Sequence, residues 1–370
     1  MQENARLYFM KGISRFLWLC YQCFVLYTLL VYALVYWVPF SGWIAGFLMM
    51  SLPVVLIIQL VSVAAWFVVD RKKALLPILM LLLGSVFLPR TFAFGKKSEV
   101  AESRSFTVMS YNAHSFMLNL VHKHDGIKQD IDVMKEWVRD AGADVICLPE
   151  YYDDVTRVFN VKEVLSGGGY RYSRFYRSVR KENPSKYLGL AIYSKYPIVA
   201  SHDTVFMAQN GMIRADIKIS GDTVRVIGLH LYSMTLNLHE LARQKRAGGV
   251  VKEGKITLRK IKTGFTERAS ELDVIRDWIG DSKYPVIVCG DFNEMPYGYV
   301  YGQLRKNLLN AFEEKGKGFG FTFNQAPYFI RIDHQFFDPR LRILDFETNQ
   351  DVKYSDHYPI SATYTFTKDQ

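Results

Sequence analysis

Residues Pro285 to Glu294 read PVIVCGDFNE and give the clearest structural signal in the chain. Four consecutive apolar residues after the proline predict a short strand that is buried on both faces. Gly290 then allows a turn where a Cβ would obstruct the backbone. Asp291 and Asn293 can both project from that turn, where a carboxylate accepts a proton and a carboxamide donates hydrogen bonds. Taken alone, the same residues also fit a strand followed by an Asx turn.

The same pattern, an apolar strand that stops at a polar side chain, recurs after residue 105. The polar residues at these strand ends are Asn112, Glu150, His230, Asp333, Asp356 and His357. Helical spacing of apolar residues predicts helices over 127–141 and 267–279, between predicted strands such as 187–194 and 211–219. We therefore expect an α/β domain in which the polar groups gather at one rim of two packed sheets.

The kinds of side chain at this rim suit one class of chemistry. Oxygen ligands without thiolates favour a hard cation, Mg²⁺ or Mn²⁺, over structural zinc, and Glu150 is the first candidate ligand. Such a cation clamps phosphate oxygens, a carboxylate activates water, and histidine and asparagine donors stabilise charge growing on phosphorus. The set predicts hydrolysis of a phosphoester.

Seven motifs in order carry a resemblance to a known family. They are SYNAH (110–114), DVICLPE (144–150), GLAIYS (189–194), GLHL (228–231), GDFN (290–293), IDH (332–334) and SDHYP (355–359). Together they resemble the endonuclease/exonuclease/phosphatase superfamily, whose fold is DNase I-like. The resemblance covers residues from about 105 to 367 and leaves out the N-terminal quarter.

The resemblance implies a four-layer α/β/β/α sandwich and a role for each residue. Glu150 would hold the metal, with Asn112 beside it and Asp356 as a further ligand. Asp291 would orient or deprotonate the attacking water, and Asn293 and His230 would contact the scissile phosphate. His357, paired with Asp333 or Asp356, would complete the site. Whether one metal or two is used stays open. His114, His122, His124, His202 and His239 have no evident partner and are expected at the surface.

The N-terminal quarter, residues 1–95, is strongly apolar. Residues 17–38 would span ~33 Å as a helix, and residues 43–69, with a kink expected at Pro53, form a longer apolar stretch. A third stretch, 74–88, reaches only ~22 Å and spans if it tilts little and Arg90 extends to the interface. A charged linker, 96–104, then leads to the predicted catalytic domain, 105–370.

Basic residues set the expected orientation of these spans. One cluster precedes the first span and a second, Arg71 to Lys73, follows the second span, which indicates that both face the cytoplasm. With three spans the catalytic domain lies in the periplasm or outside the cell, and with two it stays in the cytosol. The alternative, a buried apolar hairpin of a soluble protein, fits poorly with stretches of this length. The sequence therefore predicts a multi-pass protein of the cytoplasmic (inner) membrane.

Two further stretches are unusual. Residues 233–264 carry eight basic residues against two acidic ones, and they could line the cleft, lie on anionic lipid headgroups, or be a solvated excursion. Residues 170–177 alternate aromatic residues with arginines, which is typical either of a platform for single-stranded nucleic acid or of an edge strand protected by charge. The edge strand is the favoured interpretation.

These observations together predict a membrane-anchored, divalent-metal-dependent phosphoesterase. Its partners are then a lipid bilayer and a phosphoester substrate, most simply the headgroup phosphodiester of a phospholipid. An extracytoplasmic nuclease acting on DNA or RNA is the alternative, and a net charge of +10 fits either anionic substrate. A third possibility, a membrane sensor without catalysis, is disfavoured because Glu150, Asp291 and His357 are all present. The sequence identifies no protein partner.

Overall fold

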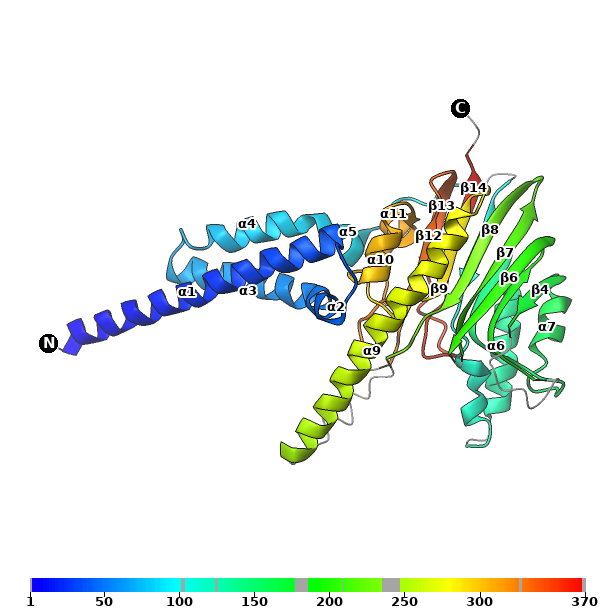
Figure 1. Cartoon of the computed structure of the whole chain (residues 1–370), viewed down its shortest axis with the longest axis horizontal. Coiled ribbons are helices and arrows are strands. Elements are labelled where there is room, and N and C mark those ends of the chain that lie inside the picture. The colour runs from blue at the N-terminus through cyan, green and yellow to red at the C-terminus, as the bar shows by residue number, and fades with distance from the viewer. Residues whose placement is uncertain are drawn as a thin grey trace.

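The computed structural model describes residues 2–100, 104–123, 126–176, 186–207, 209–234, 247–325 and 328–367. Figure 1 shows two parts of unlike architecture, a group of long helices at the N-terminal end and a body of sheets and helices that holds the C-terminal end. The helices end at Thr91, and the first long strand of the sheets begins at Phe106.

The N-terminal part consists of three helical passes that lie side by side (Figure 1). Its elements are α1 (Gln2–Trp37), α2 (Trp43–Met50), α3 (Leu52–Val69), α4 (Leu75–Gly84), η1 (Ser85–Phe87) and α5 (Leu88–Thr91). The second pass is interrupted at Ser51, close to the expected kink, and Pro53 occupies one of the first two positions of α3, where its missing N–H costs nothing. The loop that joins α3 to α4 lies at the end of this part farthest from the sheets (Figure 1).

Two of the passes, Gly12–Trp37 and Trp43–Val69, are long and apolar enough to cross a membrane. Their apolar side chains point mostly outward, and Val68 for example is 86 % exposed. The third pass, Leu75–Thr91, is shorter but extends three residues beyond the predicted stretch, to ~26 Å. Arg90 differs from expectation, because it is buried beside the carbonyl of Val35.

Polar side chains inside this part bond to one another. The hydroxyl of Tyr21 donates to Gln59 Oε1 at 2.6 Å, and Gln59 Nε2 donates to the hydroxyl of Thr28 at 2.8 Å. The packing of apolar residues outward and of bonded polar residues inward is the reverse of a soluble domain and is typical of helices in a bilayer.

Two six-stranded sheets form the middle of the second part. One has the order β13-β14-β2-β3-β5-β4, with bounds Leu341–Thr348, Ile360–Phe366, Phe106–Ser110, Val145–Asp153, Tyr187–Ser194 and Tyr172–Phe175. The other has the order β10-β12-β9-β8-β7-β6, with bounds Leu309–Asn310, Asp333–Phe337, Val286–Asp291, Asp222–His230, Asn210–Ile219 and Ile198–Met207. β4 is an edge strand, as the alternation of aromatic residues and arginines predicted.

Helices cover the outer face of each sheet. α6 (Ile127–Asp140) and α7 (Val161–Gly167) pack on the sheet that contains β3, with η2 (His114–Leu120) beside them. α9 (Ala247–Gly280) and α10 (Tyr299–Leu304) pack on the sheet that contains β9. The apolar side chains between the two sheets form a separate core. The predicted four-layer α/β/β/α sandwich is therefore confirmed.

β9 lies in the middle of its sheet, as the stretch from Pro285 to Glu294 predicted. All its residues are buried, and it pairs with β8 in parallel and with β12 in antiparallel orientation. Gly290 has a φ of 146°, and a Cβ there would lie 2.0 Å from the carbonyl oxygen of Leu229 on β8. The glycine is thus required by the close approach of β8 and β9 next to the predicted catalytic residues.

α9 is much longer than the predicted helix over 267–279. It begins at Ala247, so most of the basic stretch is helical and continues into the helix that packs on the sheet. Part of that stretch, including Arg243, Lys245 and Arg246, lies outside the described residues. The same applies to His124 and His239 among the histidines expected at the surface.

The two parts of the chain are joined by close contacts. Gln303 Nε2 donates to the carbonyl of Val38 at 2.7 Å, and Tyr297 donates to the hydroxyl of Thr91 at 2.9 Å. A short two-stranded sheet pairs β1 (Ala93–Phe94) with β11 (Lys317–Gly318). α11 (Ala311–Lys315) precedes β11 in the chain. The helices therefore contact the sandwich through partly buried hydrogen bonds as well as through the chain itself.

Candidate active site

The residues predicted at strand ends come together at one rim of the two sheets. Asn112 and Glu150 belong to the sheet that contains β3, whereas His230, Asp291 and Asp333 belong to the other. The segment that carries Asp356 and His357 precedes β14 and reaches the same rim, where the hydroxyl of Ser355 donates to the carbonyl of Asn112 at 2.7 Å.

Glu150 owes its position to an irregularity in β3. The pairing of β3 with β5 shifts register between Pro149 and Tyr151, which leaves Glu150 as a bulged residue with a φ of 51°. A bulge turns a side chain out of the regular alternation of a strand. The carboxylate, 26 % exposed, consequently reaches the cavity at the rim, where Asn112 Nδ2 donates to it at 3.2 Å.

Asp291 is held by hydrogen bonds from both sides. Asn112 Nδ2 donates to its Oδ2 at 3.0 Å, and the backbone N–H of Asn293 donates to its Oδ1 at 2.8 Å. The second bond forms the Asx turn that the sequence analysis gave as an alternative to a catalytic carboxylate. The two interpretations are compatible, because the turn positions the carboxylate. Asn293 also donates one amide hydrogen to the carbonyl of Leu231, which leaves its second amide hydrogen for another acceptor.

His230 presents one ring nitrogen to the carboxylates. Its Nδ1 lies 3.3 Å from the carbonyl oxygen of Gln209, which requires the proton on Nδ1 in the neutral ring. Its Nε2 lies 3.7 Å from Asp291 Oδ2 and 3.9 Å from Glu150 Oε1. In its charged form the ring would also donate from Nε2 toward this space.

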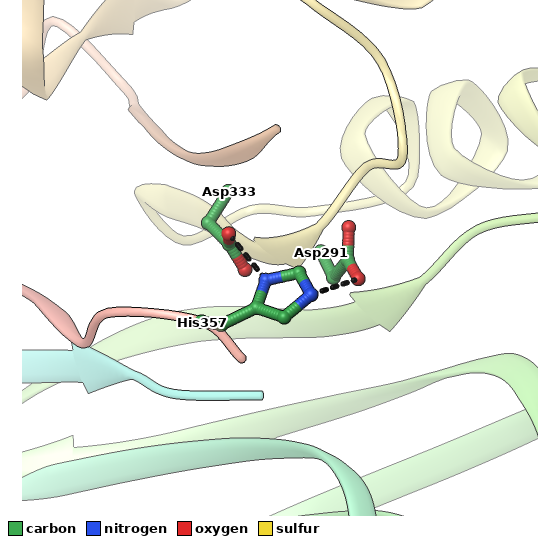
Figure 2. A group of neighbouring side chains, drawn as sticks. All are labelled: Asp291, Asp333 and His357. Atoms are coloured by element: carbon green, nitrogen blue, oxygen red, sulfur yellow. Dashed lines mark hydrogen bonds and ion pairs between the residues drawn. The ribbon is translucent and has the colours of Figure 1, made fainter. Parts of the chain in front are cut away.

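His357 stands between two buried aspartates, as Figure 2 shows. Its Nδ1 lies 2.8 Å from Asp333 Oδ2, and its Nε2 lies 3.8 Å from Asp291 Oδ2. Burial disfavours the charged ring, but the negative charges of Asp333 and Asp291 outweigh this and raise the pKa of His357 to about 10. Of the two expected partners, the structure therefore selects Asp333, and it does so through an imidazolium at neutral pH.

Asp356 pairs with a different histidine. His114 Nδ1 lies 3.1 Å from Asp356 Oδ1. Burial opposes the ionisation of Asp356, yet the hydrogen bond from His114 and the charge of His357 lower its pKa. The expectation that His114 is a surface residue without a partner is therefore wrong. His114 lies in a turn in which residues 114–117 all have positive φ, a conformation that no sequence period announces.

The donor set at this rim fits a divalent cation. Among the described residues, Asp291, Asp333 and His357 form a group whose ligand atoms lie within 4.8 Å of one another. A protonated His357 bonded to Asp333 is poorly suited to bind a cation, which leaves carboxylates as the natural ligands. Glu150 and Asp356 both line the cavity. Asn112 directs its amide nitrogen to the carboxylates and its oxygen to the N–H of His114, so it holds the carboxylates in this arrangement.

A cavity of about 440 Å³ opens in front of these residues. Glu150, Asp291 and His357 line it. Gly46 and Met50 of α2 line it as well. Sequence reasoning did not anticipate that a helix of the N-terminal part would contribute to the site, because nothing in its apolar composition indicates which end faces the sandwich.

Comparisons with known proteins agree with this architecture. The model of the Endonuclease/Exonuclease/phosphatase family matches residues 109–357, and a Domain of unknown function (DUF8431) matches residues 14–91. A search of curated proteins finds no match.

Among solved structures, a family protein from Bacteroides thetaiotaomicron has a TM-score of 0.51 at 17 % identity and covers 72 % of this chain and 100 % of its own. The human Nocturnin catalytic domain with bound sulfate anion has a TM-score of 0.49 at 17 % identity, and the match covers 72 % of this chain and 97 % of that one. A family protein from Beutenbergia cavernae has a TM-score of 0.46 at 16 % identity, and the match covers 71 % of this chain and 72 % of that one.

The family match spans more than half of the chain and includes every residue of the site described above, from Asn112 to His357. The similarity to the structure from Bacteroides thetaiotaomicron adds evidence for the fold alone. Members of this family hydrolyse phosphoester bonds, and the buried carboxylates and histidines of this rim suit that reaction. The chain therefore belongs to the Endonuclease/Exonuclease/phosphatase family and is a phosphoester hydrolase.

Proposed function

We propose that this chain is a membrane-anchored, divalent-metal-dependent phosphodiesterase that cleaves a phosphodiester in the headgroup of a lipid. The observation that carries the proposal is the composition of the cavity. Its lining combines Glu150, Asp291 and His357 with apolar residues, among them Met50 of α2 and Phe265, which packs on Gly46. A substrate that fills it would need a phosphoester for the first group and apolar atoms for the second, which describes an amphiphile.

The remaining walls support an apolar occupant. Met234, Phe265, Met295 and Ile330 line the same cavity. Phe265 lies against Gly46, where a Cβ would come within 2.5 Å of its ring, so α9 and α2 meet at the wall of the cavity. The apolar lining of the cavity is thus continuous with the helices that carry the apolar exterior.

The proposed anchor is the segment 1–95, and the proposed catalytic domain is 105–370. Exposed apolar side chains and the internal bonds of Gln59 support insertion of α1 to α4 in a bilayer. The basic loop Arg71–Lys73 lies at the end of the helices away from the sandwich (Figure 1). By the positive-inside rule this arrangement supports a multi-pass inner-membrane protein with its catalytic domain in the periplasm or outside the cell.

The chemistry assigns a task to each side chain at the rim. Glu150, with Asp356, would hold Mg²⁺ or Mn²⁺, which when bound supplies positive charge to the phosphate oxygens. Asn112 keeps its amide nitrogen on Glu150 and Asp291 and holds the two carboxylates beside the cation. Asp291, fixed by Asn112 and Asn293, orients the attacking water and accepts its proton. The second amide hydrogen of Asn293 donates to the scissile phosphate, and His230 in its charged form donates to it from Nε2. The imidazolium of His357, fixed by Asp333, keeps positive charge next to Asp291.

A nuclease acting on DNA or RNA is the alternative outcome. Most aromatic residues around β4 do not support it, because Tyr170 and Tyr176 are buried and Phe175 packs on Tyr151 and Tyr187. Tyr172 is exposed, at 38 %, and is a single ring. A platform for single-stranded nucleic acid needs aromatic faces that are free to stack with bases.

The test is hydrolysis by the full chain in detergent, with a phosphodiester lipid, the soluble diester bis(4-nitrophenyl) phosphate and single-stranded DNA as substrates. We expect cleavage of the lipid, its loss in EDTA and its recovery with Mg²⁺ or Mn²⁺. Met50→Trp, which adds bulk to the apolar lining, should reduce cleavage of the lipid at least tenfold and spare the soluble diester. Ile44→Trp, on the exposed face of α2, is the matched control. Cleavage of DNA with no cleavage of the lipid would refute the proposal.

A further inference from the structure

The first described turns of α9 form a basic arm, defined here as residues 251–264. The arm carries five basic residues against the single acid Glu253, namely Lys252, Lys255, Arg259, Lys260 and Lys262. In Figure 1 the arm slopes away from the sheets, on the side where the N-terminal helices leave the sandwich. Its surface is therefore not needed to build the catalytic fold.

An apolar stripe runs along one face of the basic arm. Val251, Leu258 and Phe265 are seven residues apart, with Gly254 and Ile261 between them, a spacing that places all five on one side of a helix. The far end of the stripe is exposed, with Val251 at 57 % and Leu258 at 46 %. The near end is buried, with Ile261 at 8 % and Phe265 at 6 %.

The buried end of the stripe packs on the start of the second apolar pass. Phe265 contacts Gly46 of α2, and the ammonium group of Lys262 lies 5.7 Å from the centre of the Trp43 ring. Trp43 is the first residue of α2, at the boundary between the apolar helices and the sandwich. Tryptophan at the end of an apolar span is typical of the bilayer interface. The contact of the arm with Gly46 and Trp43 therefore lies at the level of that interface. The exposed part of the stripe begins next to this contact.

We propose that the basic arm lies on the bilayer that holds the N-terminal helices, with its stripe among the outer acyl groups and its basic residues among anionic phosphate headgroups. This inference rests on the anchoring part of the proposed function and adds a second membrane contact next to the cavity. Basic residues beside a narrow apolar face, with an opposite polar face, are the composition of interfacial helices. The same helix carries Phe265 and Arg268 of the cavity wall, so lipid contact along the arm would hold that wall at the surface.

The experiment places a fluorescent label on the stripe. The full chain is reconstituted one per nanodisc in phosphatidylcholine, with or without phosphatidylglycerol, and with Cys20 and Cys23 of α1 replaced by serine. Cys147 and Cys289 are buried and stay. A label at Leu258→Cys should be quenched by lipids brominated on the acyl chain, at least threefold more than in discs without bromine. A label at Ile256→Cys, on the opposite, basic face, is the matched control and should not be quenched.

Charge is tested separately on the Leu258→Cys label. Each basic residue near an anionic surface contributes about fivefold to binding. Reversing Lys255 and Arg259 to glutamate should therefore reduce the ratio of bound to free arm at least ~25-fold in the discs with phosphatidylglycerol. Lys128 and Lys218 are exposed on α6 and β7, far from the arm. Reversing these two residues to glutamate changes the net charge by the same amount and should leave the quenching unchanged.

A label at Leu30→Cys, exposed in the middle of α1, reports insertion of the helices independently. If Leu30 is quenched and Leu258 is not, the arm proposal is overturned while the anchor stands. If neither label is quenched, the arm proposal and the proposed membrane anchor both fail. Catalysis on soluble substrates would still support the assignment as a hydrolase. A label at Leu258 that is unquenched in every disc but protected by single-stranded DNA would overturn the lipid assignment in favour of a nucleic-acid surface.

Discussion

The roles that we propose for single residues separate the activation of water from the holding of charge. Asp291 receives hydrogen bonds from Asn112 and Asn293, which suit it to the first role. The negative charges of two buried aspartates raise the pKa of His357 to about 10. Glu150 is the more exposed carboxylate, which suits the proposed role of cation ligand. Three predictions follow from this division, one for each residue.

Asp291→Asn should keep the shape of the turn and lose the acceptor of the proton. We expect kcat to fall by about 10²–10⁴-fold with little change in the melting temperature of the full chain in detergent. Asp277→Asn, on the exposed face of α9, removes the same charge away from the site and should retain full activity. Near-normal turnover in Asp291→Asn would remove this residue from the mechanism.

Glu150→Gln should produce a defect that added metal partly relieves, because the change weakens the cation site and leaves Asp291 in place. Activity should recover at least tenfold between low and high Mg²⁺ or Mn²⁺. Asp291→Asn serves as the contrast, since its loss should not respond to metal. Wild-type activity that is indifferent to EDTA would contradict the role of a cation altogether.

His357 should make the stability of the fold depend on pH in the alkaline range. Its pKa rises from 6.5 to about 10 on folding, so the stabilisation is fully present below about 6.5 and is lost as the pH rises through about 10. The melting temperature of the wild type should therefore fall more steeply between pH 7 and 10 than that of His357→Gln, which lacks the titrating ring. Parallel curves for the two proteins would show that the ion pair with Asp333 is not formed.

At the scale of elements, the strands were predictable and the irregularities between them were not. β5 matches its predicted bounds, and β7 begins one residue before its predicted start, because a run of apolar residues bounded by turn residues has few alternative structures. The bulge at Glu150 breaks the alternation of side chains along β3 at a residue that is not a glycine. The positive φ of residues 114–117 likewise falls on residues that are not glycines. The residues of the site could therefore be named, but the pairing of His114 with Asp356 could not.

Gly290 offers a test of the tight approach of β8 and β9. Gly290→Ala would push a Cβ to 2.0 Å from the carbonyl oxygen of Leu229 and force an alanine to a φ of 146°. We expect a loss of about 3 kcal/mol or more in the free energy of unfolding. Gly280→Ala, whose Cβ would meet no atom within 4 Å, is the matched control and should be neutral or slightly stabilising. The measurement is thermal or chemical unfolding of the full chain in detergent.

At the scale of the whole molecule, charge and length are the basis for the side of the membrane that we propose. The basic loop Arg71–Lys73 and the sandwich lie at opposite ends of the N-terminal helices (Figure 1). A pass of ~26 Å, from Leu75 to Thr91, connects them. Sequence alone left the number of passes undecided because the apolar stretch is interrupted at Arg90. The structure buries that arginine against α1, where its backbone carbonyl accepts a hydrogen bond from Arg331 of the sandwich.

A reporter enzyme that is active only outside the cytoplasm tests this orientation directly. Fused after Lys97 it should be active, and fused after Lys73 it should be silent, because an odd number of passes separates the two points. Both fusions should be present in the membrane fraction in equal amount. A silent reporter after Lys97 would put the catalytic domain in the cytosol.

The hydrogen bonds of Val38, Arg90 and Thr91 to the sandwich tie the catalytic rim to the ends of the helices. An enzyme whose helices are inserted as we propose cannot leave one membrane to search another. Its encounters with the proposed lipid substrate would then take place in two dimensions, so its rate should follow the mole fraction of substrate in the surface and not the bulk concentration. Diluting the substrate with inert lipid at constant bulk concentration would slow turnover, whereas diluting the whole suspension with buffer would not.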